Sequence, residues 1–306
     1  MAESGCGDRL PRPVAMTAPR YRPEMTAAGL RPAQAVTAVD QYAERHTVMV
    51  AGERPLTVFL DDREIVTLMT LGTHPELLTL GYLLNQRLVP CLESVDAITV
   101  DWRHDRVQVQ SFEAIADLEA KLKHRVVTSG CGQGTVFGRI EASMEALRLP
   151  QRPVSQARIY ALLDRVAACN EVYKRAGAVH GCALCGFAAQ GAVELDLFVE
   201  DVGRHNAADA IAGFMWLNAV KGEHKWFYTT GRLTSEMVIK VAQMGIPTLI
   251  SRSGVTQKGL ELAQQVGVVL IARAKGTHFL VYNGVERVVF DAMPRPRHRG
   301  ADQGKP

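Results

Sequence analysis

The chain has no long apolar segment and no strong charge imbalance. No hydrophobic run approaches the roughly 20 residues of a membrane-spanning helix, so we expect no association with a membrane. The first forty residues contain several arginines but no apolar stretch of the kind found in signal peptides, which argues against secretion. The formal net charge is only +3 over 306 residues. This excess is too small to indicate nucleic-acid binding, although a phosphate-bearing small ligand is compatible with it.

Cysteine is also scarce, with six in the chain. A chain of 306 residues can bury a substantial core without covalent cross-links. Six cysteines spread over this length are not the pattern of a small secreted domain that depends on disulfides. We therefore expect free thiols and a location in the reducing cytoplasm.

Two of the cysteines, Cys182 and Cys185, have the C-x-x-C spacing of a zinc site, with His180 just upstream. Residues 179–187 read as a strand, however, and residues three apart on a strand point to opposite faces. His180 and Cys182 would then share a face that Cys185 does not. No second ligand pair follows in the sequence, so we expect two buried cysteines and no structural metal.

The sequence predicts an α/β protein with two folded parts between disordered tails. Residues 1–40 and 292–306 are rich in proline, arginine and small residues and favour disorder. Residues 41–150 hold short apolar runs between turn residues and predict a small α+β domain that ends in a loop around Cys131. Residues 151–291 alternate strand and helix periodicities, which predicts a layered α/β domain with a helix-flanked sheet.

The individual elements follow from hydrophobic periodicity and from caps. Thr73–Glu76 has the pattern of a capping box before a helix that reaches Leu88, and Ser155 is expected to cap the next helix. Further helices are expected near residues 159–166, 206–220, 234–244 and 256–266. Strands are expected at residues 47–50, 56–60, 65–69, 95–100, 107–109, 179–187, 193–199, 225–230, 248–251, 268–272, 279–282 and 285–290.

No Walker lysine motif and no G-x-G-x-x-G fingerprint is present, so any nucleotide site has to be built in another way. Three expected strands end in an arginine beside glycine and small polar residues, within Glu200–Asn206, Thr229–Arg232 and Ser251–Gly254. Strand ends that meet at one edge suit an anionic ligand, held by backbone N–H groups, helix N-termini and guanidinium groups. For Glu200–Asn206 the alternative is a structural role, with an Asp–Arg ion pair and Asn206 as a helix cap.

A fourth expected strand, residues 268–272, is followed by Arg273, Lys275 and His278 in the stretch RAKGTH. Two cations with a glycine and a threonine suit phosphate or a guanine nucleotide. The alternative is a solvated basic turn before the strand at residues 279–282. The sequence alone leaves both interpretations open.

The stretch TSGCGQG, residues 128–134, surrounds Cys131 with three glycines. A thiol without bulky neighbours is accessible to another protein, which favours sulfur exchange or carriage, and a persulfide is one form it can hold. The alternative is an incidental free thiol in a tight turn. Position 134 is glycine, so this loop has no C-x-x-C dithiol.

These segments together resemble the FdhD family of formate dehydrogenase accessory proteins, also called sulfur carriers or sulfurtransferases. The likeness runs from about residue 53 to about residue 290. It is carried by VHGCALC, by EDVGRHN, by TGRLTSEM, by the strand-rich stretch that ends in ARAKGTHFLVYNG, and by TSGCGQG. The two tails lie outside it.

The resemblance implies a sulfurtransferase-type carrier. Such a protein accepts sulfur from a cysteine desulfurase as a persulfide and passes it to Mo-bis(molybdopterin guanine dinucleotide), before that cofactor enters the formate dehydrogenase catalytic subunit. The persulfide residue matches Cys131. The resemblance also implies homodimers and a C-terminal domain similar to the cytidine deaminase fold without its zinc ligands. The cofactor-binding segment matches Arg273, Ala274, Lys275, Gly276, Thr277 and His278.

One departure from the family pattern is Gly134, where many members have a second loop cysteine. Cys182 and Cys185 are the candidates for a relay in its place, although no spacing supports that role. One thiolate is enough to hold a sulfane sulfur, so the departure is compatible with sulfur carriage. The alternatives are a cofactor-binding chaperone that moves no sulfur and a deaminase-like zinc hydrolase.

Overall fold

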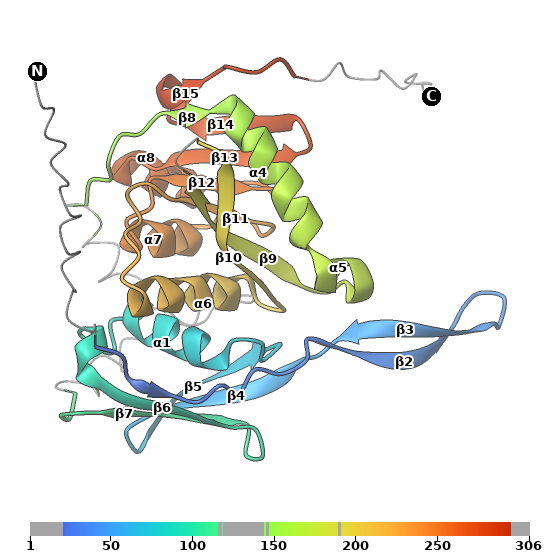
Figure 1. The fold of residues 1–306 in the computed structure, drawn as a ribbon, viewed down its shortest axis with the longest axis vertical. Coiled ribbons are helices and arrows are strands. Elements are labelled where there is room, and N and C mark those ends of the chain that lie inside the picture. The colour runs from blue at the N-terminus through green and yellow to red at the C-terminus, as the bar shows by residue number, and fades with distance from the viewer. Residues whose placement is uncertain (1–20, 116–117, 119–143, 145–146, 189–190, 295–306) are drawn as a thin grey trace, which may run out of the picture.

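The computed structural model describes residues 21–115, 118, 144, 147–188 and 191–294, and the Cys131 loop lies outside them. Two sheets are separated by helices (Figure 1). No helix among these residues is long and apolar enough to cross a membrane. The expected disordered segment at residues 1–40 is wrong in its second half, because two strands lie there: Glu24–Met25 (β1) and Ala33–Val39 (β2).

The N-terminal sheet has five strands in the order β1-β6-β7-β4-β5. Buried apolar residues alternate with half-buried ones in β4, so that Leu56, Val58 and Leu60 all point into the core. The helix Pro75–Asn85 (α1) lies between this sheet and the C-terminal helices. The remaining strands are Arg54–Leu60 (β4), Arg63–Thr70 (β5), Val95–Asp101 (β6) and Arg106–Ser111 (β7), with a short 3₁₀ turn at Leu92–Ser94.

The C-terminal sheet has six strands in the order β10-β9-β11-β12-β13-β14. The three central strands β11, β12 and β13 are parallel, whereas the other pairings are antiparallel. The strands are His180–Phe187 (β9), Val193–Asp201 (β10), Trp226–Thr229 (β11), Thr248–Ser251 (β12), Val269–Lys275 (β13) and His278–Asn283 (β14).

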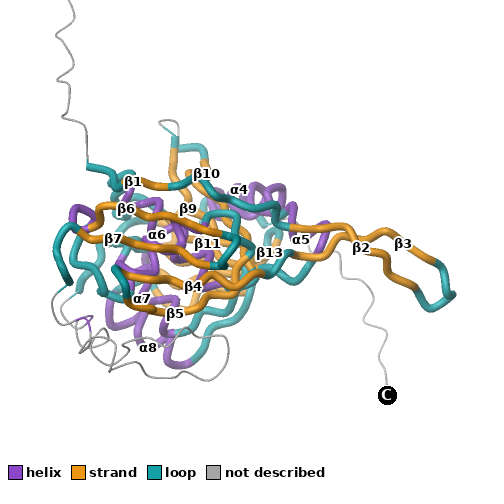
Figure 2. Tube along the Cα trace, turned by 90° about the horizontal axis from the view of Figure 1, so that it is seen from below, coloured by secondary structure: helices purple, strands orange, loops and turns teal. Residues whose placement is uncertain are grey.

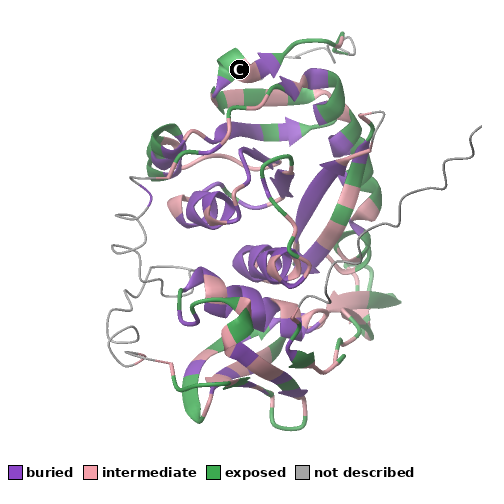
Figure 3. Ribbon diagram, turned by 60° about the vertical axis from the view of Figure 1, so that its left-hand side comes forward, coloured by how far each residue is buried: buried purple, intermediate pink, exposed green. Residues whose placement is uncertain are grey.

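Helices cover both faces of this sheet (Figure 1). Arg204–Leu217 (α6), Ser235–Gln243 (α7) and Gln257–Val266 (α8) pack on one face, and Gln156–Cys169 (α4) with Glu171–Ala176 (α5) on the other. Figure 3 shows buried residues throughout the helices between the two sheets. The expected cap is confirmed, because the Ser155 hydroxyl accepts the Arg158 N–H at 3.2 Å.

Two local expectations are wrong. Thr73–Glu76 does not form a capping box, since α1 begins after His74 and the Glu76 carboxylate accepts from Thr26 and from the Ala28 N–H instead. The expected strand at residues 285–290 is a 3₁₀ turn, Val285–Arg287, followed by Val288–Val289 (β15), which pairs with Val154–Ser155 (β8). In both places a contact with a segment distant in sequence overrides the local signal.

The two sheets share one hydrophobic core through α1 and α6. Gly81 and Gly213 let these helices approach backbone to backbone. A Cβ at Gly81 would lie 1.8 Å from the backbone O of Asp209, and one at Gly213 would lie 2.1 Å from that of Leu77. Beside this contact, buried Lys240 forms an ion pair with Asp209 at 2.7 Å, and Asn85 also donates to that carboxylate. The N-terminal part is therefore fixed firmly to the C-terminal sheet.

Gly81→Ala is expected to lower the free energy of unfolding by about 3 kcal/mol or more. Helix propensity alone predicts the opposite sign, a gain of about 1 kcal/mol. Urea denaturation followed by circular dichroism distinguishes the two effects, because they change the free energy of unfolding in opposite directions. An alanine variant as stable as the wild type would contradict the close contact between α1 and α6.

The strands β2 and Arg45–Ala51 (β3) form a two-stranded arm that projects from the body (Figures 1 and 2). The arm leaves the body beside α5, which contacts β3. Its tip is the turn from Asp40 to Glu44, where Asp40 accepts the N–H groups of Tyr42 and Glu44.

Candidate functional site

Polar residues gather at the edge of the C-terminal sheet where β11, β12 and β13 end. Because these strands are parallel, their carboxyl ends meet there, with Thr229 beside Ser251. The antiparallel partner β9 begins at the same edge, where His180 pairs with Asp201 at the end of β10. The chain segments expected to form an anionic site therefore do come together.

Four arginines lie along this edge: Arg204, Arg232, Arg252 and Arg273. We call them the arginine edge. The first three lie close to His180, and their charges add to burial, the largest effect, in lowering the pKa of that imidazole. Arg204 is buried, whereas Arg232 and Arg273 are exposed. A neutral imidazole among guanidinium groups leaves the edge positively charged, as an anionic ligand requires.

A glycine provides space for one of the arginine side chains. A Cβ at Gly231 would lie 2.6 Å from Cδ of Arg204, so only glycine leaves that side chain its position. Gly254 also faces the guanidinium group of Arg273, but a Cβ there would lie 3.5 Å from the nearest nitrogen, an ordinary contact distance. On the other side of the edge, the guanidinium group of Arg252 lies 5.1 Å from the ring centre of Tyr173 in α5.

The sequence predicted that the stretch RAKGTH follows a strand, but the first part of it lies inside the strand. β13 continues to Lys275, and Gly276 and Thr277 form the turn to β14. Arg273 has a left-handed backbone with φ of 54° at a bulge, and its N–H donates to the Ser253 carbonyl at 2.9 Å. The side chain of Ala274 is buried in the core. Arg273 therefore belongs to the arginine edge, while Lys275 and His278 lie farther along the hairpin.

In the stretch EDVGRHN, some residues stabilise the fold and one lies at the candidate site. Glu200 accepts the N–H groups of Val172 and Tyr173, which fixes the start of α5. Asp201 accepts from the Thr70 hydroxyl at 2.5 Å and from the Leu71 N–H at 3.1 Å, so it joins the two sheets.

Asn206 completes this junction, donating to Asp201 and to the Met69 carbonyl. The structural alternative is thus correct in that both carboxylates and Asn206 hold the fold together, but Asn206 is not the helix cap, because α6 is capped at Gly203 and Asn206 lies in its first turn. Arg204 is the residue of this stretch that lies at the arginine edge.

A comparison with known protein families shows which family the chain belongs to. The model of the FdhD/NarQ family matches residues 51–289, which is most of the chain. The chain belongs to the FdhD/NarQ family. The resemblance drawn from EDVGRHN, TGRLTSEM and TSGCGQG is therefore confirmed.

Curated relatives and a solved structure agree with this membership. The chain is 27% identical to the sulfur carrier protein FdhD of Listeria innocua over 243 residues, 78% of this chain and 91% of that protein. It is 28% identical to the sulfur carrier protein FdhD of Bacillus subtilis over 237 residues, covering 77% and 88%. A crystal structure from Desulfotalea psychrophila, described as a formate dehydrogenase accessory protein, matches with a TM-score of 0.65 at 27% identity, covering 84% and 98%.

The cysteine pair of this FdhD/NarQ family member is poorly placed to relay sulfur. Cys182 and Cys185 lie on opposite faces of the sheet, as expected, and both are fully buried. Burial raises the pKa of Cys182 to about 12, and burial also raises the pKa of Cys185. Neither thiol is therefore ionised or accessible near neutral pH. Among the described residues, no group of three metal-ligating side chains includes either cysteine.

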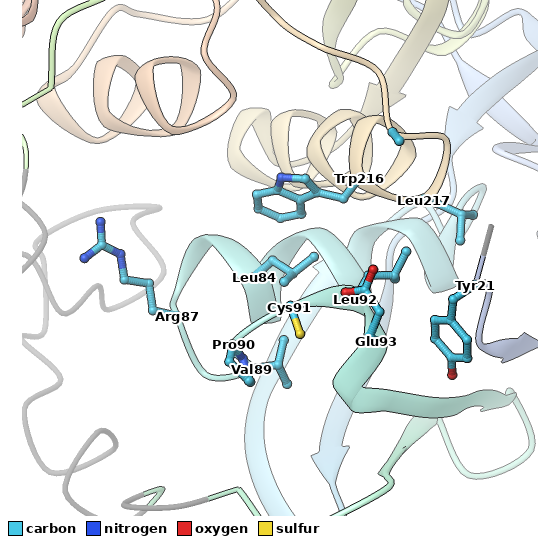
Figure 4. A pocket seen from close by; sticks show the side chains of 11 residues that line it. Tyr21, Leu84, Arg87, Val89, Pro90, Cys91, Leu92, Glu93, Trp216 and Leu217 are labelled. Atoms are coloured by element: carbon cyan, nitrogen blue, oxygen red, sulfur yellow. The ribbon is translucent and has the colours of Figure 1, made fainter. Parts of the chain in front are cut away.

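Cys91 is an exposed thiol that sequence analysis did not single out. It lines a pocket of ≈ 890 Å³ with Leu84, Arg87 and Trp216 (Figure 4). The pocket lies where α1 and α6 end, whereas the arginine edge lies where α6 begins. The sequence offered no signal for Cys91, because the pocket is completed by Trp216 and Leu217, which are distant in the chain.

A buried pair lies beneath the arginine edge. Nε2 of His205 is 3.3 Å from Oε2 of Glu236, and both side chains are almost fully buried. Burial lowers the pKa of His205 to about 2, and the charges of Lys240, Arg204 and His180 add to this effect. His205 is therefore neutral in the folded protein at any pH above that value, whereas in the unfolded chain it takes a proton near pH 6.5.

This difference predicts a pH dependence of stability. Below about pH 6.5 the unfolded chain binds a proton at His205 that the folded protein does not, so the free energy of unfolding falls as the pH falls, by about 1.4 kcal/mol per unit. Between pH 7.5 and pH 5.0 the wild type should lose about 2 kcal/mol more than His205→Gln. Urea denaturation of both proteins at the two pH values measures this. Equal losses would show that His205 is protonated alike in both states.

Proposed function

We propose that this protein is a sulfur carrier that serves formate dehydrogenase. One observation carries the proposal: a member of the FdhD/NarQ family keeps a glycine-flanked cysteine, Cys131, and presents the arginine edge at the end of its sheet. Relatives that are named sulfur carrier proteins support the same role. A persulfide is stable only where competing oxidants are few, so we expect the protein to work in the cytoplasm.

The first step is sulfur transfer from a cysteine desulfurase. The Cys131 thiolate attacks the outer sulfur of the desulfurase persulfide, and a new S–S bond forms on Cys131 as the old one breaks. The desulfurase cysteine leaves as a thiolate, so no oxidant or reductant is needed. Because Cys182 and Cys185 are buried and protonated, Cys131 performs this step without their help.

The arginine edge is the proposed binding site for the Mo-bis(molybdopterin guanine dinucleotide) substrate. Exposed guanidinium groups of Arg232 and Arg273 offer forked donors for pyrophosphate. Lys275 adds a further cation along the hairpin. A sulfido ligand is two electrons more reduced than a sulfane sulfur, so the receiving molybdenum supplies both electrons and Cys131 is released as a thiolate.

Chain length allows Cys131 to meet both partners. Met144 lines a pocket with Trp216 and Gln243, at the ends of α6 and α7 opposite the arginine edge. The 14 residues of α6 separate the two places by about 21 Å. Cys131 precedes Met144 by thirteen positions in the sequence, and a chain of that length spans at most about 45 Å. The chain between Cys131 and Met144 is therefore long enough to cover this distance.

The competing functions differ in what they require. A cofactor-binding chaperone needs the arginine edge but not the thiol, and a deaminase-like hydrolase needs zinc. The likeness of the C-terminal sheet to the cytidine deaminase fold stays a prediction, and it favours neither alternative because fold does not fix chemistry.

Incubation with a cysteine desulfurase and cysteine is expected to add about 32 Da, one sulfur, to the tryptic peptide that contains Cys131. Peptide mass spectrometry under non-reducing conditions measures this, and dithiothreitol should remove the adduct. The peptide that contains Cys91 is the internal control, because that exposed thiol meets the same reagents. Unmodified Cys131, or equal modification of both peptides, would contradict the proposed carrier.

A further inference from the structure

His180 lies among the side chains of the arginine edge, at the first position of β9, and its ring is half-buried. Strand alternation places it on the same face as Cys182, whose Sγ lies 3.8 Å from the Arg204 carbonyl oxygen. Nδ1 of the ring is 3.4 Å from the Thr230 hydroxyl, which itself accepts the Gly181 N–H at 3.0 Å. Nε2 has no hydrogen-bond partner among the described residues. One ring nitrogen is therefore held and the other is available to a ligand.

The carboxylates of the neighbouring strand do not serve as partners of this imidazole. Asp201 stands opposite His180 in the register of β9 and β10. Its two oxygens, however, accept four hydrogen bonds from the junction between the sheets and from the start of α6. Glu200 accepts the first N–H groups of α5. In the part of the chain that the structure describes, no carboxylate forms an ion pair with His180.

The other side chains that face His180 are cationic or neutral. They come from the starts of α5 and α6 and from the segments after β11 and β12, and they are Tyr173, Arg204, His205, Arg232 and Arg252. Burial, followed by the charges of the three arginines, lowers the pKa of His180. The imidazole is therefore neutral near pH 7 in the free protein. It is an ionisable group kept uncharged in a place where a negatively charged ligand is expected.

We propose that His180 is a further binding residue of the arginine edge, which takes up a proton from solvent when the anionic substrate binds and donates a hydrogen bond to it from Nε2. This inference rests on the proposed function, because it requires a pyrophosphate at the edge. Two phosphate charges offset the guanidinium charges that repel a proton from the ring. They also provide the acceptor that the charged form of an imidazole needs. The proton forms one N–H bond, and no other bond is made or broken.

Proton uptake makes the affinity depend on pH. Because the bound form holds a proton that the free form lacks, binding becomes tighter as the pH falls, by at most about tenfold per pH unit. The added charge also discriminates between ligands, since only a nearby anion stabilises the imidazolium. His180 therefore favours a pyrophosphate over an uncharged group of similar size.

Guanosine diphosphate mannose is a suitable probe, because its pyrophosphate is esterified at both ends and does not titrate between about pH 5 and pH 8, unlike a terminal phosphate, whose second pKa is about 6. Calorimetric titration at pH 6.5, in buffers with different enthalpies of ionisation, gives the number of protons bound with each ligand. The wild type should take up about one proton and His180→Gln close to none. The ratio of their affinities should fall by about tenfold between pH 6.0 and pH 8.0.

His224→Gln is the matched control, because His224 is exposed just before β11, at the opposite end of that strand from the arginine edge. It should take up the same proton as the wild type. The affinity of His180→Gln at pH 8.0 shows whether that variant keeps the folded site.

The possible failures separate this inference from the proposed function. Nucleotide binding without proton uptake in the wild type would overturn the role of His180 and leave the arginine edge as the binding site. Uptake that persists in His180→Gln, or that is lost in His278→Gln instead, would overturn it too, the latter by placing the proton on the hairpin between β13 and β14. A wild type that binds no nucleotide at any pH would overturn the site itself and this inference with it.

Discussion

Replacing Cys131 with serine is expected to reduce the activation of sulfur-free formate dehydrogenase to the level seen without carrier, a loss of at least about 10²-fold. We expect so large a loss because neither a second loop thiol nor the buried cysteine pair can replace Cys131. Gly134 removes the second loop thiol, and the buried pair Cys182 and Cys185 is protonated and out of reach. The measurement is formate oxidation after incubation of the enzyme with desulfurase, cysteine and either carrier.

Two control variants make this result specific. Cys91→Ser removes an exposed thiol, and Cys182→Ala removes a buried one, so neither should lower activation more than about twofold once folding is verified. If Cys131→Ser supported full activation, the protein would be a cofactor-binding chaperone. If Cys91→Ser abolished activation instead, the sulfur-carrying thiol would have been assigned to the wrong residue.

Removal of two arginines from the edge is expected to weaken the binding of guanosine diphosphate by about 10²-fold or more. Each hydrogen bond from a charged donor contributes about 1.5–3 kcal/mol, so the loss of two in Arg232→Ala/Arg273→Ala has a large effect. Guanosine diphosphate is the probe because it carries the base and pyrophosphate of the proposed substrate. Isothermal titration calorimetry on the wild type and the double variant gives the two dissociation constants.

Arg165→Ala is the matched control, because Arg165 is exposed on α4, which packs on the sheet through Leu162 and Val166. It should bind the nucleotide as the wild type does. Equal affinity in the wild type and the double variant would remove the arginine edge from the proposed site. A separate loss in Lys275→Ala would show how far the ligand extends along the hairpin between β13 and β14.

Sequence patterns were sufficient to predict the features that depend on residues close to one another in the chain. The cap at Ser155 and the opposite faces of Cys182 and Cys185 follow from spacing alone, and both are confirmed. The clustering of strand ends follows from the topology of parallel strands, which the alternation of helices and strands indicates.

Other features depend on segments far apart in sequence and could not be predicted. Asp201 bonds Thr70 across 131 positions, so its role in joining the sheets has no local signature. Gly81 has no local signature either, although it meets the backbone of Asp209. The error at Arg273 was avoidable, because small and charged residues alternate from Ala272 to Lys275 with the period of a strand.

The most direct test of sulfur carriage is a chase with radioactive sulfur. The protein is loaded with ³⁵S by the desulfurase, separated from it, and mixed with Mo-bis(molybdopterin guanine dinucleotide). The label is then followed on Cys131 and on the cofactor. Label is expected to leave Cys131 and to appear on the cofactor in equal amount, and to stay on Cys131 in Arg232→Ala/Arg273→Ala. Label that remains on Cys131 in the wild type while the cofactor is bound, or that reaches the cofactor through Cys131→Ser, would contradict sulfur carriage by this residue.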